Sequence, residues 1–125
     1  MIKGIESILI ASSDPQALAK FYEEKVGFKE AEEYELGEGD SVFNFTFDTG
    51  PALMIVSHSK VKGRNQDSHR FEINFEVEDI DEAVEKVKGN SVKVIQEKYH
   101  IEGYGYLATF EDLDGNYFQL AQIKG

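Results

Sequence analysis

Residues 8–15 read ILIASSDP, and residues 73–80 read INFEVEDI. Each stretch is an apolar, strand-like run that leads into an aspartate and then into a short amphipathic helix pattern with further strand-like sequence. Asp14 and Asp79 lie 65 positions apart, about half of the 125-residue chain. The pattern indicates one structural unit present twice. We therefore expect a ligand site in the cleft or curved sheet that two such units form.

Length and charge narrow the class of protein. A chain of 125 residues is typical of one domain. The net charge of −11 is the opposite of the basic surface that nucleic-acid binding requires, and it favours cationic ligands. No apolar run approaches the roughly 20 residues of a membrane span, and nothing at the N-terminus resembles a signal peptide. The absence of cysteine is compatible with the reducing cytoplasm, so we expect a cytoplasmic protein that binds neither nucleic acid nor membrane.

Both predicted helices have clear start signals. Asp14 can accept a hydrogen bond from a free backbone N–H of the first turn, and Pro15 suits the first helical position because it has no N–H. Asp79 and Glu82 form a similar capping pair at the second helix. Gly27 is expected to end the first helix, and Gly89-Asn90 the second.

Alternating apolar and polar residues predict the strands. In the first half they are 5–11, 28–36, 42–48 and 52–58, with a turn at 37–40, and in the second half 72–77, 92–97, 104–110 and 117–123. Asp114-Gly115 predicts a hairpin between the last two. Residues 59–70 are polar and basic, and read as a solvated linker. The order β-α-β-β-β occurs twice, in modules 1–60 and 71–125. This predicts an α+β fold in which two βαβββ modules form a cupped mixed sheet with helices on its outer face.

Three motifs together resemble the vicinal-oxygen-chelate superfamily, which includes glyoxalase I, bleomycin-resistance proteins and extradiol dioxygenases. They are Asp14 with the FY and GF pairs at 21–22 and 27–28, VEDIDEA at 77–83, and FEDLDGN at 110–116. The resemblance covers essentially the whole chain. It departs at Leu113, where the family commonly has proline, a tolerable change in a loop.

The resemblance implies two modules forming a cup, usually in a homodimer, and in the family's metalloenzymes one divalent ion in the cup. The four ligand positions then fall at Ser7, near Met54, at Glu72 and at Gln119. Zinc, nickel and iron prefer imidazole, thiolate and carboxylate donors, so this set predicts that the usual metal site is absent. The three histidines show no metal-binding spacing.

Strand alternation gives a set of candidate ligand-binding residues. If Glu72 faces the cup, so do Asn74 and Glu76, while the residues between them pack under a helix. Glu72 is also the candidate catalytic group, as a general base or proton donor. Structural pairing of Glu72 with Arg70 or Lys98, and a core role for the tyrosines, remain open. The predicted ligand-binding set is Ser7, Met54, Glu72, Asn74, Tyr104, Tyr106, Tyr117 and Gln119.

These observations favour a cytoplasmic, homodimeric small-molecule-binding protein that resembles the bleomycin-resistance branch and has no metal cofactor. A glyoxalase-like lyase or isomerase, with an atypical metal set or Glu72 as a base, is the enzymatic alternative. An interaction or regulatory subunit with a filled cup is the third reading.

Overall fold

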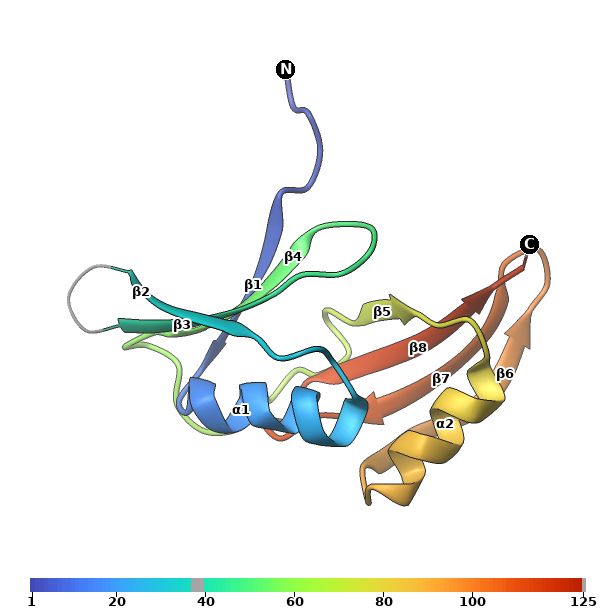
Figure 1. Cartoon of the computed structure of the whole chain (residues 1–125). Coiled ribbons are helices and arrows are strands. Elements are labelled where there is room, and N and C mark those ends of the chain that lie inside the picture. The colour runs from blue at the N-terminus through green and yellow to red at the C-terminus, as the bar shows by residue number, and fades with distance from the viewer. Residues whose placement is uncertain (37–39, 125) are drawn as a thin grey trace. The chain divides into compact units, whose positions relative to one another are not determined.

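The structure, a computed structural model, describes residues 1–36 and 40–124. The chain divides into two compact units, unit 1 over Met1–Gly63 and unit 2 over Arg64–Gly125. Each unit has one four-stranded mixed sheet and one α-helix. The strand orders are β1-β4-β3-β2 and β5-β8-β7-β6, and in each sheet only the first pair is parallel (Figure 1). The predicted α+β class with two βαβββ modules is therefore confirmed.

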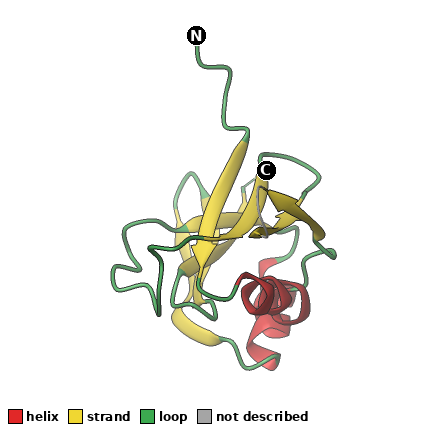
Figure 2. Cartoon of the chain, turned by 90° about the vertical axis from the view of Figure 1, so that its left-hand side faces the viewer, coloured by secondary structure: helices red, strands yellow, loops and turns green. Residues whose placement is uncertain are grey.

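Unit 1 begins with an extended segment that leads into β1 (Figure 2). The Asp14 carboxylate accepts a hydrogen bond from the Ala17 N–H and caps α1, as the sequence predicts. Gly27, in the left-handed conformation with a φ of 99°, ends the helical region. The elements are β1 (Ser7–Ser12), α1 (Pro15–Phe21), a π-helical turn (Tyr22–Val26), β2 (Glu32–Leu36), β3 (Asp40–Phe45) and β4 (Ala52–Ser57).

Aromatic packing explains why β2 is shorter than predicted. The sequence favours a strand from Phe28 onward, but the Phe28 ring stacks on Tyr22 at 5.1 Å and meets Phe45 edge-on at 5.3 Å. The half-buried Phe28 thus packs against the buried rings of Tyr22 and Phe45, and the strand begins at Glu32. The predicted turn at residues 37–40 lies largely outside the described residues.

Unit 2 consists of β5 (Ile73–Glu76), α2 (Ile80–Gly89), β6 (Lys93–Ile101), β7 (Gly105–Glu111) and β8 (Tyr117–Ile123). The Asp79 carboxylate accepts from the Glu82 N–H and caps α2. The helix packs against β6, β7 and β8. Val87 of α2 and the stacked rings of Phe110 and Phe118 are fully buried, so the apolar face of the sheet lies under the helix (Figure 1).

The linker differs from the expectation of a solvated connector. Its second half belongs to unit 2 and binds the β7–β8 hairpin. Arg64 forms an ion pair with Glu111 at 3.0 Å, Asn65 donates to the Asn116 side chain at 2.9 Å, and the Ser68 hydroxyl donates to the Gly115 carbonyl at 2.6 Å. These contacts fix the chain just before β5. In the described residues, no helix is long and apolar enough to cross a membrane.

Candidate functional site

The sheet of unit 2 leaves one face without a helix, and we call the face opposite α2 the open face. The pairing register of β5 and β8 shows which side chains lie on this face. Asn74 pairs with Gln119 and Phe75 pairs with Leu120, so these two pairs occupy opposite faces. The Phe75 ring lies 6.1 Å from the buried Phe118 ring, on the helix side. Asn74 and Gln119 therefore lie on the open face, as the alternation predicts.

A chain of hydrogen bonds connects β6, β8 and the residue just before β5 across this face. Gln119 Nε2 donates to Glu72 Oε1 at 3.1 Å, and the Tyr99 hydroxyl donates to Gln119 Oε1 at 3.3 Å. The tyrosine thus fixes which end of the Gln119 amide faces the carboxylate. Only 23% of the Glu72 side chain is exposed, so the carboxylate is held in a partly desolvated position.

A histidine lies at the other end of this chain. The His69 Nδ1 is 3.6 Å from Glu72 Oε2, an ion-pair distance when the ring is protonated. The same ring meets Tyr117 edge-on, with centroids 4.7 Å apart. His69 is 75% exposed, so it covers the carboxylate from the solvent side. We call these five residues the Glu72 cluster: His69, Glu72, Tyr99, Tyr117 and Gln119.

A second polar pair lies beside the cluster. Asn74 Nδ2 donates to the Tyr104 hydroxyl at 3.2 Å, which brings the turn before β7 to the edge strand β5. Both side chains are exposed, as is Glu76, two residues after Asn74. The structure therefore brings together Glu72, Asn74, Tyr104, Tyr117 and Gln119 of the predicted set on unit 2.

Tyr106 lies elsewhere in unit 2. It pairs with Gln122 of β8, whose Oε1 accepts the N–H of Ile80 at the start of α2. Tyr106 is therefore on the helix side of the sheet, opposite the Glu72 cluster. The structure therefore does not bring Tyr106 together with the other predicted residues of unit 2. Its neighbours Leu107 and Ala108 are both buried, so alternation along β7 could not fix the facing of Tyr106.

Ser7 and Met54 are both in unit 1. Ser7 pairs with Ala52 and Leu9 pairs with Met54 across the parallel β1–β4 ladder. Alternation along the two strands places Ser7, Leu9 and Met54 on one face of that sheet. The helix-side residues Leu53 and Ile55 are fully buried on the other face.

The donors in unit 2 do not fit a divalent metal. An amide ligates through its oxygen, but the Gln119 Oε1 accepts the Tyr99 hydroxyl, and the Nε2 that faces Glu72 cannot ligate. Serine and methionine, at the other two positions, are poor ligands for zinc or iron. In residues 1–36 and 40–124, no three histidine, cysteine, aspartate or glutamate side chains are grouped as a metal site requires.

Tyr99 and His69 are the cluster members that sequence reasoning missed. Tyr99 was outside the strand predicted for residues 92–97, and two irregularities in the β6–β7 register, between Val94 and Tyr99, disturb simple alternation. His69 was visible only as a residue three positions before Glu72 on the segment that leads into β5. Its fixed position depends on the linker contacts to the β7–β8 hairpin.

Three comparisons place this architecture among known proteins. Residues 4–120 match the model of the Glyoxalase/Bleomycin resistance protein/Dioxygenase superfamily. The chain is 32% identical over 122 residues to the uncharacterised protein YetH of Bacillus subtilis (strain 168), covering 98% of this chain and 100% of YetH.

Solved structures agree with this match at the level of fold. TnmS3, an antibiotic-binding protein from Streptomyces sp. CB03234, superposes with a TM-score of 0.76 at 20% identity over 98% of each chain. The trypanothione-dependent glyoxalase I of Leishmania major gives 0.75 at 22% identity, covering 97% of this chain and 87% of that one. With the family match spanning nearly the whole sequence, the chain belongs to the glyoxalase/bleomycin-resistance/dioxygenase superfamily.

Proposed function

We propose that the protein captures a small organic molecule, without a metal, on the open face of unit 2, and that the ligand presents a cationic or hydrogen-bond-donating group to Glu72. The observation that carries this proposal is the orientation of Glu72. Its Oε1 accepts a hydrogen bond from Gln119. Its Oε2 lies 3.6 Å from Nδ1 of the exposed His69 ring, which is too long for a strong hydrogen bond. A ligand cation can displace or replace that ring and gain a charge-assisted hydrogen bond.

The aromatic residues around Glu72 suit the same kind of ligand. Tyr117 and Tyr99 belong to the cluster, and Tyr104 is held beside it by Asn74. A cation over a tyrosine ring gains about 0.5–2 kcal/mol, depending on how far it is desolvated. The net charge of −11 adds long-range attraction for cations and repels anions.

The proposal also covers the branch of the superfamily, two residues of unit 1 and the cellular location. Antibiotic binding by TnmS3, a protein of the same fold, supports stoichiometric capture as in the bleomycin-resistance branch. Ser7 and Met54 stay predicted ligand-binding residues of unit 1. We also propose a cytoplasmic location, because the chain has no cysteine.

A homodimer is part of the proposal, and the edge strand β1 is its support. The other edge of that sheet, β2, carries the charges of Glu32, Glu33 and Glu35, which deter pairing with a second chain. β1 carries none, and Leu9 on it is 60% exposed. We therefore assign β1 to contact with a second copy.

Isothermal titration calorimetry with two cationic aromatic probes, ethidium and bleomycin, tests capture. We expect saturable binding of at least one probe with one molecule per chain, and mass spectrometry should recover the probe unchanged. No heat and no thermal shift with either probe at millimolar concentration would refute the proposal. Absence of binding is the result expected for the third reading, an interaction or regulatory subunit whose ligand-binding face is filled by the chain's own side chains.

The contact between His69 and Glu72 favours one alternative, a glyoxalase-like lyase or isomerase in which Glu72 acts as a base. An exposed imidazole at 3.6 Å can pass a proton between the carboxylate and solvent. Metal analysis of protein purified without added metal separates the cases. Near-stoichiometric nickel, zinc or iron that is lost in Glu72→Ala supports a metalloenzyme, whereas turnover without metal that is lost in Glu72→Gln supports a base mechanism.

A further inference from the structure

A hollow of about 300 Å³ lies on unit 2 away from the Glu72 cluster. Three side chains from adjacent strands form a row across it, because His100 of β6 pairs with Tyr106 of β7, which pairs with Gln122 of β8. This row is on the helix side of the sheet, next to the first turn of α2. The hollow is lined by His100, Gly105, Tyr106, Gln122, Ile123 and Lys124.

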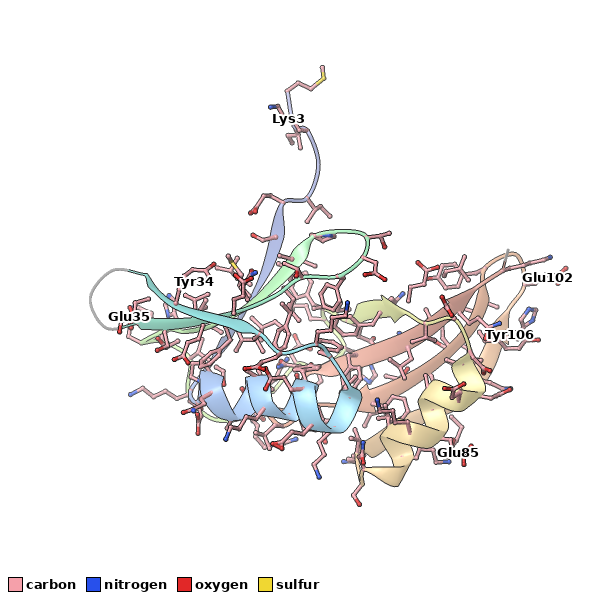
Figure 3. All side chains as sticks on the ribbon, in the orientation of Figure 1. Lys3, Tyr34, Glu35, Glu85, Glu102 and Tyr106 are labelled. Atoms are coloured by element: carbon pink, nitrogen blue, oxygen red, sulfur yellow. The ribbon has the colours of Figure 1, made fainter. Side chains whose placement is uncertain are left out.

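One wall of the hollow is aromatic and held in place. The rings of His100 and Tyr106 lie 4.8 Å apart with an interplanar angle of 45°. The Lys98 Nζ lies 5.3 Å from the Tyr106 ring centroid and is anchored to Asp81 of α2 at 2.7 Å. Tyr106 nevertheless remains 39% exposed at this end of unit 2 (Figure 3). An exposed ring fixed on one side is a ready stacking surface for a planar ligand.

The other end of the hollow offers hydrogen-bond donors. Gln122 Oε1 accepts the Ile80 N–H at 2.8 Å, which fixes the side-chain amide. Because Gln122 lines the hollow, its Nε2 is the amide group available to a ligand there. Lys124 follows two residues later on the same side and adds an exposed ammonium group. Asp81 neutralises the charge of Lys98, so the ammonium group of Lys124 is the positive charge that a ligand in the hollow would meet.

From this geometry we infer that unit 2 has a second ligand site, on its helix side, for a planar aromatic molecule with a hydrogen-bond-accepting edge such as a carboxylate. The ring stacks on Tyr106 and His100, while the acceptor takes hydrogen bonds from Gln122 Nε2 and Lys124 Nζ. The site is independent of the proposed capture at Glu72. It lies on the opposite face of the sheet and prefers the opposite ligand charge.

An amide NMR titration of the whole chain with 2-naphthoate tests this site. We expect shifts confined to residues 98–106 and 122–124, with a dissociation constant on the order of 1 mM, as suits a small ligand in an open site. Cyclohexanecarboxylate, which has the same charge and no aromatic face, should bind at least about fivefold more weakly.

Gln122→Glu is the decisive variant. It keeps an oxygen for the Ile80 N–H and replaces the donor at the hollow by an acceptor, so 2-naphthoate binding should weaken at least about tenfold. Tyr106→Leu should weaken it comparably, and it carries the test if Gln122→Glu fails to fold. Glu72→Gln should leave the affinity within about twofold. Shifts at the Glu72 cluster, equal binding of cyclohexanecarboxylate, or unchanged affinity in the folded variants would overturn the inference.

Discussion

Gln119 donates a hydrogen bond from its Nε2 to the Glu72 Oε1 at 3.1 Å, and the Tyr99 hydroxyl donates to the opposite end of the same amide. The carboxylate is thus oriented by an amide of β8 that is itself oriented by a tyrosine of β6, two strands away in the sheet. In a half-buried position, such a network holds a charged group in one geometry before any ligand arrives.

Removal of the Tyr99 hydroxyl tests this orienting role. In Tyr99→Phe, Gln119 loses the contact that fixes its amide, so we expect binding of ethidium to weaken about three- to tenfold. The free energy of unfolding should fall by about 1 kcal/mol, the usual contribution of one hydrogen bond. Tyr34→Phe, at a half-exposed tyrosine of unit 1, is the control and should leave both quantities unchanged. Calorimetry and urea unfolding measure the two effects, and unaltered affinity in Tyr99→Phe would contradict the role.

Asp112 is expected to stabilise the β7–β8 hairpin. It is buried, its Oδ1 accepts from the N–H groups of Asp114 and Asn116, and its Oδ2 accepts from Asn116 Nδ2. Asp112→Ala leaves these donors without their acceptor, and should lower the free energy of unfolding by about 2–4 kcal/mol. Glu102→Ala, in the exposed β6–β7 turn, should change it by less than about 0.5 kcal/mol. A loss below 1 kcal/mol for Asp112→Ala in urea unfolding would argue against this account.

The Lys98–Asp81 pair links β6 to α2. It predicts that the titration of Lys98 changes when Asp81 is replaced. The hydrogen bond to Asp81 raises the pKa of the Lys98 ammonium, against a smaller opposing effect of desolvation. A raised pKa means that the pair stabilises the fold at neutral pH, and that this contribution is lost as the pH rises through the folded-state pKa of Lys98.

Asp81→Asn should therefore lower the pKa of Lys98, followed by NMR of its Cε–Hε signals. Glu85→Gln removes the same charge one turn further along α2 (Figure 3). Glu85 is not among the groups that shift the Lys98 pKa, so this variant is the control and should leave the titration unchanged. If Lys98 titrates identically in the two variants, the hydrogen bond does not cause the shift.

The exposed edge of β1 predicts how the chain associates. If a second copy covers it, Leu9→Lys places a charge in an apolar contact and should raise the dimer dissociation constant at least about tenfold. Leu113→Lys makes the same change at an exposed position of unit 2 and should leave association intact. Sedimentation velocity distinguishes them. A wild-type chain that stays monomeric at high concentration, or a Leu9→Lys variant that dimerises normally, rules out this interface.

Much of the fold could be predicted because local signals agree with tertiary packing. Asp14 and Asp79 act as helix caps in the structure, and Gly27 ends its helix in the left-handed conformation. Errors arose where long-range packing overrides local pattern. Phe28 reads as a strand residue but packs in an aromatic core, and the basic linker binds a hairpin through Arg64.

The candidate site was predictable where alternation is clean. On β5 and β8 it placed Asn74 and Gln119 on one face, as the parallel register shows. It failed on β7, since residues 107–110 are all buried and the residues next to Tyr106 in the sequence, Gly105 and Leu107, are buried as well. It also failed on β6, where irregular register brings Tyr99 to Gln119 from beyond the predicted strand end.

The central claim is that the Glu72 charge binds the ligand, and one comparison tests it most directly: calorimetric titration of ethidium into Glu72→Gln and Glu76→Gln. The two variants remove the same charge from the same strand region, but only Glu72 contacts Gln119, while Glu76 is exposed. We predict that Glu72→Gln weakens binding at least about tenfold, because a charge-assisted contact is lost, and that Glu76→Gln stays within about twofold. Equal losses in both variants, or full affinity in Glu72→Gln, would contradict the account.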